Sequence, residues 1–571
     1  MAYDLIVRGG TVVDGSGMKG YRADVGVADG RIAAIGDLAG EAAKETLDAE
    51  GHVVAPGFID AHTHMDAQIF WDPIGENSCW HGVTSTVMGN CGFSLAPCAE
   101  KDKRLVMHNL ERAEDISPEA MDAGIPWSWE TYPEYLDAID KLPKGINYAG
   151  YLGHSALRTH VMGPRAAEEA ATEDDLAAMT RELAEGLRAG AMGFSTSCAS
   201  SHRTPDGKPV ASRLAAWSEV EALVGVMGDL GAGVFEIARE NNEHNAEEAA
   251  AEKEQIKRLA IETGVPITFG NPWFKRRRPG TWRAHIEMID DIAAAGGRVL
   301  VQGSAWWHGS MRSFETLTPF DKAPVWEDFR KLPLEEQKKG LRNPEMRARL
   351  VEAANTFEHK PNPAFPNALN RPVQWEWFFP LLGTLPPFVS VAEIAKRENK
   401  DPVDVMIDMS LERDFKLFFV DPSNNEDPDF VLWMIRHPNC TVTFTDAGAH
   451  VTTTLNPVHS FLLGHWVRNA REIPLESAIR KITFDIAAFW GIKGRGLLRE
   501  GYHADICVFD PETIAPRLPK LVHDLPTGAA RLLQKADGIR ATVVNGEMLI
   551  RDGEHTGALP GRLLRGPLAH N

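Results

Sequence analysis

The sequence of 571 residues predicts an α/β protein: a (β/α)8 barrel of the TIM type with a small β-sandwich built from both ends of the chain. Three observations predict it. Short apolar runs typical of buried strands alternate with amphipathic helical patterns along the middle of the chain. Hairpin patterns occur at both ends. The chain is also far longer than one compact core usually holds, which favours a large domain plus a smaller one.

Turn signals between apolar stretches mark a hairpin at each end of the chain. Near the N-terminus, alternating apolar residues lead into Asp29-Gly30, and the C-terminal "IRATVVNGEMLI" turns at Asn545-Gly546. Such dipeptides between strand-like runs are the strongest short-range hairpin signal. We therefore expect strands of both ends to meet in one composite β-sandwich.

Eight apolar runs in the middle of the chain predict the barrel strands. They are Val53–Ile59, Thr84–Met88, Asn147–Leu152, Ala191–Thr196, Gly233–Ile237, Pro266–Phe269, Arg298–Gln302 and Cys440–Thr445. Helical patterns separate many of them, and the pairs Thr172/Asp175 and Ser218/Glu221 predict capping boxes at two helix starts. Eight alternating units indicate a (β/α)8 barrel, in which the chemistry lies at the C-terminal ends of the strands.

The predicted division of the chain follows from these patterns. Residues 1–55 and 497–571 form the composite β-sandwich, and residues 56–496 form the barrel, with a long insertion at about 305–437. The insertion carries charge-rich helical stretches and the aromatic cluster "WEWFF". A structureless loop of that length is improbable, so we expect a lid or an oligomer contact there. A homo-oligomer is consistent with this segment.

Composition excludes several classes of protein. The formal net charge of −20 disfavours a nucleic-acid partner or an anionic membrane, because both need a basic surface. No signal peptide and no membrane-length apolar run is recognisable. Six cysteines in so long a chain are too sparse for a disulfide framework, which favours the cytoplasm.

The stretch "PGFIDAHTHMD" carries two histidines at the end of the first predicted strand. On an extended strand, His62 and His64 point to the same side, so both imidazoles project into the mouth of the barrel. Two converging imidazoles suit a metal ion. A bare His-x-His is more often an ordinary polar strand end, and the full motif is far more specific.

This motif resembles the first strand of the amidohydrolase superfamily. The stretches "GVTSTVMGNCGFSLAP", "GHSALR" and "GAMGFST" are similar to those of its D-aminoacylase branch, the N-acyl-D-amino-acid deacylases. The resemblance covers nearly the whole chain and is weakest from about 235 to 435. It implies a zinc-carrying barrel that hydrolyses an amide bond, with a β-domain from both termini.

The resemblance also implies a set of metal ligands. His62 and His64 would bind metal, Cys91 in "GNCGFS" would be a further ligand, and Asp446 in "TVTFTDAGAH" would be both ligand and catalytic general base. A carboxylate suits that double role. The alternatives are a buried apolar Cys91 and a helix cap at Asp446. For His450, a metal or substrate contact and a solvent-facing loop position are equally favoured.

Two ligands expected from the resemblance are missing. Where the fifth and sixth strands would supply histidines, this sequence has Ile237 and Phe269, neither of which binds zinc. We therefore expect one or two divalent metal ions, with a mononuclear zinc site favoured. Three or four protein ligands plus water make a plausible catalytic zinc.

Further residues are candidates for substrate binding. His154 and Arg158 follow the third strand, and Arg158 would clamp a substrate carboxylate or pair with a neighbouring acid. His202 lies in a polar loop after the fourth strand. Trp306 and Trp307 would make a broad apolar pocket wall that favours a bulky substrate, or else they belong to the core.

The predicted function is metal-dependent hydrolysis of a C–N amide bond in a small molecule, as in an N-acyl-amino-acid deacylase. One alternative is a cyclic amide or carbamate hydrolase. The absence of a lysine in "AMGFSTSC" on the fourth strand weighs against sites that use a bridging lysine. The other alternative is a barrel that has lost catalysis and only binds ligands. The missing histidines favour it, and the retained His62, His64 and Asp446 oppose it.

Overall fold

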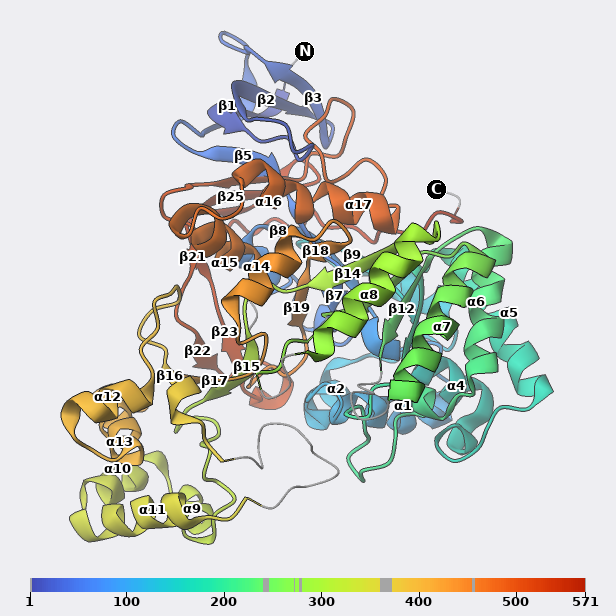
Figure 1. The fold of residues 1–571 in the computed structure, drawn as a ribbon. Coiled ribbons are helices and arrows are strands. Elements are labelled where there is room, and N and C mark those ends of the chain that lie inside the picture. Colours follow the sequence, from blue (N-terminus) through green and yellow to red (C-terminus); the bar gives the residue numbers. More distant parts are fainter. Residues whose placement is uncertain are drawn as a thin grey trace.

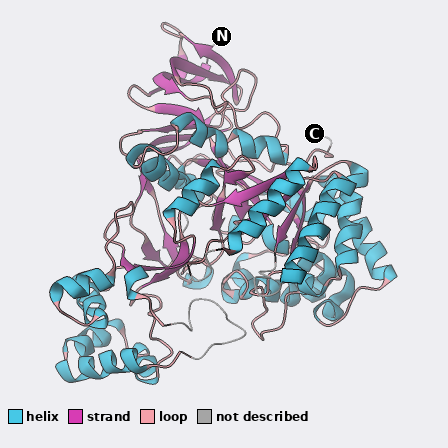
Figure 2. Cartoon of the chain, viewed as in Figure 1, coloured by secondary structure: helices cyan, strands magenta, loops and turns pink. Residues whose placement is uncertain are grey.

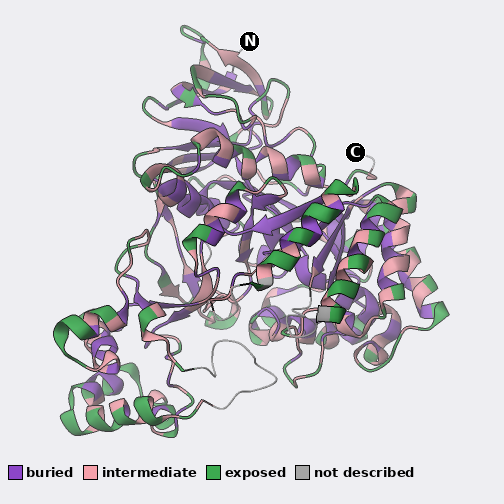
Figure 3. Cartoon of the chain, viewed as in Figure 1, coloured by how far each residue is buried: buried purple, intermediate pink, exposed green. Residues whose placement is uncertain are grey.

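We describe a computed structural model of the chain that covers residues 3–239, 246–271, 273–276, 280–359, 372–453 and 457–569. It is a mixed α/β protein, as the sequence predicts. Strands occupy the middle of the molecule and its N-terminal end, and helices lie on the outside of the middle part (Figure 2). Strands at the centre of the molecule are buried, while the outer faces of the surrounding helices are exposed (Figure 3).

Parallel strands form the middle of the molecule and overlap the eight predicted runs (Figure 1). The run Val53–Ile59 is divided, because its first half, β5 (Val53–Pro56), joins the sheet made by the chain ends. One sheet has the order β6-β8-β9 and another the order β10-β11-β12-β13-β14-β18, with every pairing parallel. Their bounds are β6 Phe58–Asp60, β8 Val83–Met88, β9 Asn147–Gly150, β10 Leu152–Gly153, β11 Gly193–Ser197, β12 Val234–Ala238, β13 Ile267–Gly270, β14 Val299–Gly303 and β18 Cys440–Val442.

The first and last of these strand regions pair with each other. Strand β7 (His62–Thr63) follows β6 directly, and β19 (Phe444–Ala447) follows β18. The two are parallel, with Phe444 opposite His62. The amide of His64 continues the pairing by donating to the carbonyl of Ala447 at 2.7 Å. This contact brings the His-x-His motif next to the segment that carries Asp446.

Strands from both ends of the chain join in one sheet. It has nine strands in the order β27-β26-β25-β20-β5-β1-β2-β3, with β4 beside β1, and it lies at the N-terminal end of the molecule in Figure 1. The bounds are β1 Tyr3–Val12, β2 Tyr21–Ala28, β3 Arg31–Gly36, β4 Ala43–Asp48, β5 Val53–Pro56, β20 Ile506–Phe509, β25 Ile539–Val544, β26 Glu547–Arg551 and β27 Glu554–His555. Both predicted hairpins are confirmed, as β2–β3 and β25–β26.

Helices connect the parallel strands. The principal ones are α1 Lys103–Glu111, α2 Pro118–Gly124, α3 Tyr132–Lys141, α4 His154–Met162, α5 Glu173–Ala189, α6 Trp217–Leu230, α7 Ala246–Thr263, α8 Thr281–Ala294, α16 Leu475–Lys481 and α17 Phe484–Trp490. The capping box of Thr172 and Asp175 is confirmed at the start of α5. The predicted box of Ser218 and Glu221 is wrong, because α6 begins earlier, with Ala216 as its cap and no side-chain cap bond.

The insertion has its own secondary structure. It contains α9 Pro324–Arg330, α10 Leu334–Arg342, α11 Pro344–Thr356, α12 Val391–Glu398, α13 Pro402–Glu412 and α14 Pro428–Arg436, with the small sheet β15 (His308–Arg312), β17 (Phe419–Asn424) and β16 (Phe379–Pro380). A separate hydrophobic cluster, which includes Phe314, Trp326 and Phe378, packs α9 to α13 together, while the buried residues of α14 belong to the main core. Phe378 and Phe379 of "WEWFF" are buried. Part of this aromatic stretch therefore belongs to the core and not to the exposed surface.

In the part of the chain that the structure describes, no helix combines the length and the apolar character needed to cross a bilayer.

Candidate metal centre

The end of β7 and the end of β19 place three of the predicted residues together. Nε2 of His64 lies 3.2 Å from Oδ1 of Asp446, and Nε2 of His62 lies 3.5 Å from the same oxygen. The two imidazole rings are 5.4 Å apart and nearly perpendicular. Both histidines are 1% exposed. Two imidazoles and a carboxylate therefore converge on one buried point, as the motif predicts.

The backbone geometry at Asp446 explains how its carboxylate comes close to His62 and His64. Asp446 has φ 61°, in the left-handed region, which is uncommon outside glycine and is concentrated at functional sites. Gly448 has φ 97°, and a Cβ added there would lie 2.4 Å from the carbonyl oxygen of His64. Only glycine permits the two chain segments to come this close. The "DAGAH" segment therefore lies close to the strand that carries His62 and His64, and it places Asp446 beside them.

Cys91 reaches the same point from the end of β8. It lies in a short 3-10 turn, Asn90–Gly92, with φ 58°. Its backbone amide donates to Oε2 of Glu236 at 2.7 Å, and its Sγ lies 3.7 Å from Nε2 of His62. The ligand atoms of His62, His64 and Cys91 all lie within 4.8 Å of one another.

The nitrogens of both histidines suit a metal ion. Nδ1 of His62 lies 2.6 Å from the amide oxygen of Gln302 on β14, so Nδ1 carries the proton and Nε2 presents its lone pair to the site. His64 is buried, and its Nε2 lies 3.2 Å from Oδ1 of Asp446, while Nδ1 has no hydrogen-bond partner in the described structure. Nε2 of both histidines therefore faces the site. With a thiol and a carboxylate beside them, the donor set fits zinc.

The charges of this centre interact strongly. Burial lowers the pKa of His62 to about 4, against the attraction of Asp446. For His64, burial alone would lower the pKa, but Glu114, Asp446 and Asp66 raise it to about 9. Burial would raise the pKa of Asp446, but the neighbouring imidazoles of His64 and His62 outweigh it and hold that pKa below its usual value. The centre therefore has a negative field that attracts a cation.

One residue of this centre escaped the sequence analysis. Glu114 is 2% exposed, and its Oε2 lies 3.5 Å from Nε2 of His64. Glu114, His64 and Asp446 form a further group of ligand atoms within 4.8 Å of one another. Glu114 comes from the segment between α1 and α2, where "AEDIS" contains no motif. No local sequence signal points to it.

His202 and His450 also lie at this end of the strands. His202 shares a ligand group with Cys91 and Glu114. His450 has φ 49°, and its amide donates to the carbonyl of Glu114 at 2.7 Å. None of the ligand groups found among the described residues includes His450. Its predicted metal ligation is therefore without geometric support, although its charge acts on Asp446.

His154 and Arg158 point elsewhere. The guanidinium of Arg158 donates to Glu219 at 2.6 Å and to the carbonyl of Glu169 at 2.8 Å. Nε2 of His154 lies 2.8 Å from Glu219, and its Nδ1 lies 2.7 Å from Oγ1 of Thr196. Both residues are fully buried. Of the two interpretations of Arg158, the geometry favours pairing with a neighbouring acid over a clamp for substrate.

Trp306 and Trp307 pack away from the histidines. Trp306 is 5% exposed and lies against Phe461 at 4.3 Å, and Trp307 stacks on Phe379 of the insertion at 5.1 Å between ring centroids. Of the two interpretations, this geometry favours the core. The aromatic wall beside the centre is formed instead by Phe444, which stacks on His62 at 4.1 Å, and by Trp273 behind it at 5.5 Å.

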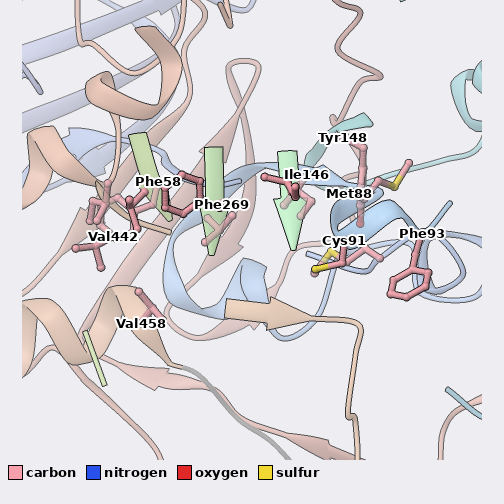
Figure 4. Close-up of a cluster of buried hydrophobic side chains, with 14 of the residues drawn as sticks. Phe58, Met88, Cys91, Phe93, Ile146, Tyr148, Phe269, Val442 and Val458 are labelled. Carbon is pink, nitrogen blue, oxygen red and sulfur yellow. The ribbon is translucent and has the colours of Figure 1, made fainter. Parts of the chain in front are cut away.

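The strands that lack histidines turn different residues toward the centre. Along β12, Glu236 bonds Cys91, so the next residue, Ile237, points to the opposite face, where it joins the hydrophobic core. Phe269 on β13 is also in that core, and Figure 4 shows it among the buried side chains that include Cys91 and Phe93. A Cβ at Gly270 would meet the ring of Phe444 at 2.8 Å. Neither strand offers an imidazole.

This constellation has the donor set of a metal site, and comparison with known proteins identifies the family of the chain. The chain belongs to the amidohydrolase family, whose model matches residues 45–550. This confirms the resemblance predicted from the motifs.

Particular relatives and a solved structure are similar over nearly the full length. D-aminoacylase of Alcaligenes xylosoxydans xylosoxydans is 30% identical, over 98% of this chain and 97% of the relative. N-acyl-D-aspartate deacylase of the same organism is 29% identical, over 98% and 95%. The crystal structure of N-acyl-D-glutamate deacylase from Bordetella bronchiseptica, complexed with zinc and a phosphonate inhibitor, has a TM-score of 0.65 and 26% identity, and the match covers 99% of this chain and 100% of that one.

Proposed function

We propose that this chain is a zinc-dependent hydrolase that cleaves the amide C–N bond of an N-acyl amino acid or a similar small amide. The observation that carries the proposal is the convergence of His62, His64 and Asp446 on one buried point. The relatives named as D-aminoacylase and as deacylases of N-acyl-D-aspartate and N-acyl-D-glutamate support the reaction type.

We assign the tightly held zinc to His62, His64 and Asp446, with Cys91 beside them. The position of Nε2 of His64 beside Asp446 and the fixed tautomer of His62 support this assignment. Bound zinc would supply a Lewis acid that polarises a carbonyl and activates water. A single functional ion agrees with a solved D-aminoacylase, 25% identical, that is described as having a binuclear centre with one-metal activation and second-metal attenuation.

Asp446 is the proposed general base. Its carboxylate accepts the proton of the attacking water and then delivers that proton to the leaving amine nitrogen. Because the imidazoles beside it hold its pKa low, Asp446 is ionised at neutral pH. The aromatic wall of Phe444 and Trp273 excludes water on one side and gives the substrate an apolar contact.

We propose that the parallel strands close into a (β/α)8 barrel. The pairing of β19 with β7 and that of β18 with β14 support closure, because they link the first strand region to the last. The division into a β-sandwich of residues 1–55 and 497–571 and a catalytic barrel of residues 56–496 is part of the same proposal, supported by the nine-stranded sheet.

The cytoplasm and a homo-oligomer remain proposals about the setting of the enzyme. Cys79, Cys91, Cys98, Cys440 and Cys507 form no disulfide among the residues that the structure describes, which supports a reducing compartment. Size-exclusion chromatography with light scattering tests the oligomer. Deletion of the insertion tests whether that segment makes the contact.

The test of the proposed function combines metal analysis with turnover. The parent protein, His62→Ala and Asp446→Asn are analysed for zinc and assayed on N-acetyl amino acids of both configurations. We expect hydrolysis by the parent, loss of tightly held zinc in His62→Ala, and loss of turnover in both variants. A parent that holds no metal under any loading would overturn the proposal in favour of a ligand-binding barrel.

A further inference from the structure

A hairpin from the C-terminal part of the chain lies away from the sheet that its neighbouring strands join. Between β20 and β25 the chain forms β22 (Lys520–Val522) and β23 (Arg531–Leu533), which pair with each other. Figure 1 shows both strands beside β15 and β17 of the insertion and away from the nine-stranded sheet. Leu532 of β23 packs there against Met311 and Val420. The hairpin therefore contacts the insertion as well as its own domain.

Strand β23 is bonded to the segment that carries the proposed general base. The amide of Leu532 donates to the carbonyl of Val451 at 2.7 Å, five residues after Asp446. The other end of this segment is held by β7, because the amide of His64 donates to the carbonyl of Ala447 at 2.7 Å. The backbone around Asp446 is therefore fixed from two sides, by the metal-binding strand and by the C-terminal hairpin.

The loop that follows β7 holds the same strand by its opposite edge. Nδ2 of Asn77 donates to the carbonyl of Leu532 at 3.2 Å, and Oδ1 of Asn77 accepts from the amide of Gln534 at 2.8 Å. The carbonyl of Gln534 lies 3.2 Å from Nε2 of His81. Leu532 thus links the loop after the first barrel strand to the loop after the last one.

Arg531 anchors the hairpin in this place. Its side chain is 8% exposed, and its Nε and Nη2 donate to the two carboxylate oxygens of Asp524 at 2.7 and 2.8 Å. Nη2 also donates to Glu76, and Nη1 lies 3.7 Å from Asp72. A bidentate pair between arginine and a carboxylate fixes geometry as well as charge. One guanidinium therefore joins the hairpin turn to the loop after β7.

The hairpin and the segment of Asp446 line the same cavity. Asp446 and Gly448 contribute to its wall on one side, and Arg531, Leu532 and Gln534 contribute from the C-terminal part of the chain. A reacting group must be held to within about 0.5 Å of its productive position by the contacts behind it. The bond from Leu532 to the loop of Asp446 is such a contact.

We infer that Arg531 is a positioning residue for the reaction. Through the neighbouring Leu532 it holds the segment of Asp446 where the carboxylate can reach the attacking water and the leaving amine. The inference rests on the proposed function, because it is there that Asp446 acts as the general base. It also assigns the C-terminal hairpin to the active site.

The test compares the zinc-loaded full chain with its Arg531→Lys and Asn77→Ala variants. Lysine keeps the positive charge but cannot make the two-point contact with Asp524. Arg517→Met is the matched control, because Arg517 lies in the same part of the chain and pairs with Asp537 at an exposed position. At saturating zinc, kcat should fall at least ~10-fold in both variants, with KM nearly unchanged, and the control should match the parent.

Hydrogen–deuterium exchange provides a readout that does not depend on turnover. Peptides that cover residues 446–453 and 530–534 should exchange at least ~10-fold faster in Arg531→Lys and Asn77→Ala than in the parent and the control. A purely structural role of Arg531 elsewhere in the chain would leave the first of these peptides unchanged. Thermal unfolding checks that each variant is folded.

The outcomes separate this inference from the proposed function. A kcat equal to that of the parent in either variant overturns the inference. A lower kcat without faster exchange in both peptides also overturns it, because Arg531 would then act by another route. If the parent hydrolyses no amide, the proposed function fails, and the exchange comparison alone decides whether the hairpin holds the segment of Asp446.

Discussion

Two sets of strand ends meet at the candidate centre, and they differ in chemistry. The ends of β7, β8 and β19 carry His62, His64, Cys91 and Asp446. The ends of β12 and β13 carry no imidazole. They contribute Glu236 toward Cys91, while Phe269 belongs to the core. The comparison teaches that the ends of β7, β8 and β19 carry the donor set of a metal site. The ends of β12 and β13 serve mainly to support it.

The largest effect should follow a change on the donor side. Asp446→Asn removes the proposed proton acceptor and should lower kcat/KM by about 10²–10⁴-fold. The assay is run at saturating zinc, so that weakened metal binding does not dominate the result. Retention of more than a tenth of the parent's activity would show that another group carries the proton.

A change on the supporting side should cost stability and leave the metal in place. Phe269 is 2% exposed, and Phe269→Ala should lower the free energy of unfolding by about 3–5 kcal/mol through the cavity that it leaves. Denaturant unfolding measures this loss. The metal content of the variant should match that of the parent. Loss of zinc would show that the supporting strands are also needed for metal binding.

Removal of the metal should destabilise the donor side. A ligand present at 100 times its Kd stabilises the folded state by ~2.7 kcal/mol. Chelation should remove this stabilisation and lower the Tm. Calorimetric scans with and without a chelator measure it. His62→Ala provides the control, because its Tm should not respond to the chelator.

The smallest predicted effect concerns a contact made to the donor side by β14, the neighbour of β13. Gln302 on β14 fixes the tautomer of His62, and Gln302→Leu should weaken zinc binding by about 10–100-fold. Competition with a chromophoric chelator measures the affinity. Thr268→Val on the neighbouring strand removes a hydroxyl that donates to Leu300 and not to a proposed ligand, so it should bind zinc like the parent.

The sequence predicted the parts of this centre that depend on strand alternation and motif. His62 and His64 share a face because they are two residues apart on a strand, and Asp446 follows a recognisable strand. Glu114 was not predictable, because it reaches the site through the tertiary contact between its carbonyl and the amide of His450. Arg158 was ambiguous, since its partner Glu219 lies 61 residues away in the chain.

The fold followed the same pattern. Turn dipeptides predicted both hairpins, and apolar runs predicted the parallel strands. The start of α6 was missed, because Ser218 and Glu221 imitate a capping box inside a helix that Ala216 begins. The sequence allows Trp306 and Trp307 to line a pocket or to belong to the core, and only their packing against Phe461 and Phe379 distinguishes the two.

The pairing of β5 with β20 has a consequence for biosynthesis. Val53 lies opposite Phe509, so this strand emerges from the ribosome more than 400 residues before its partner. At 5–20 residues per second, the wait is roughly 20–90 s. During that time one edge of β5 has unpaired backbone groups, the kind of edge that recruits strands of other chains. Production of this protein should therefore depend on chaperone capacity until the last strands are translated.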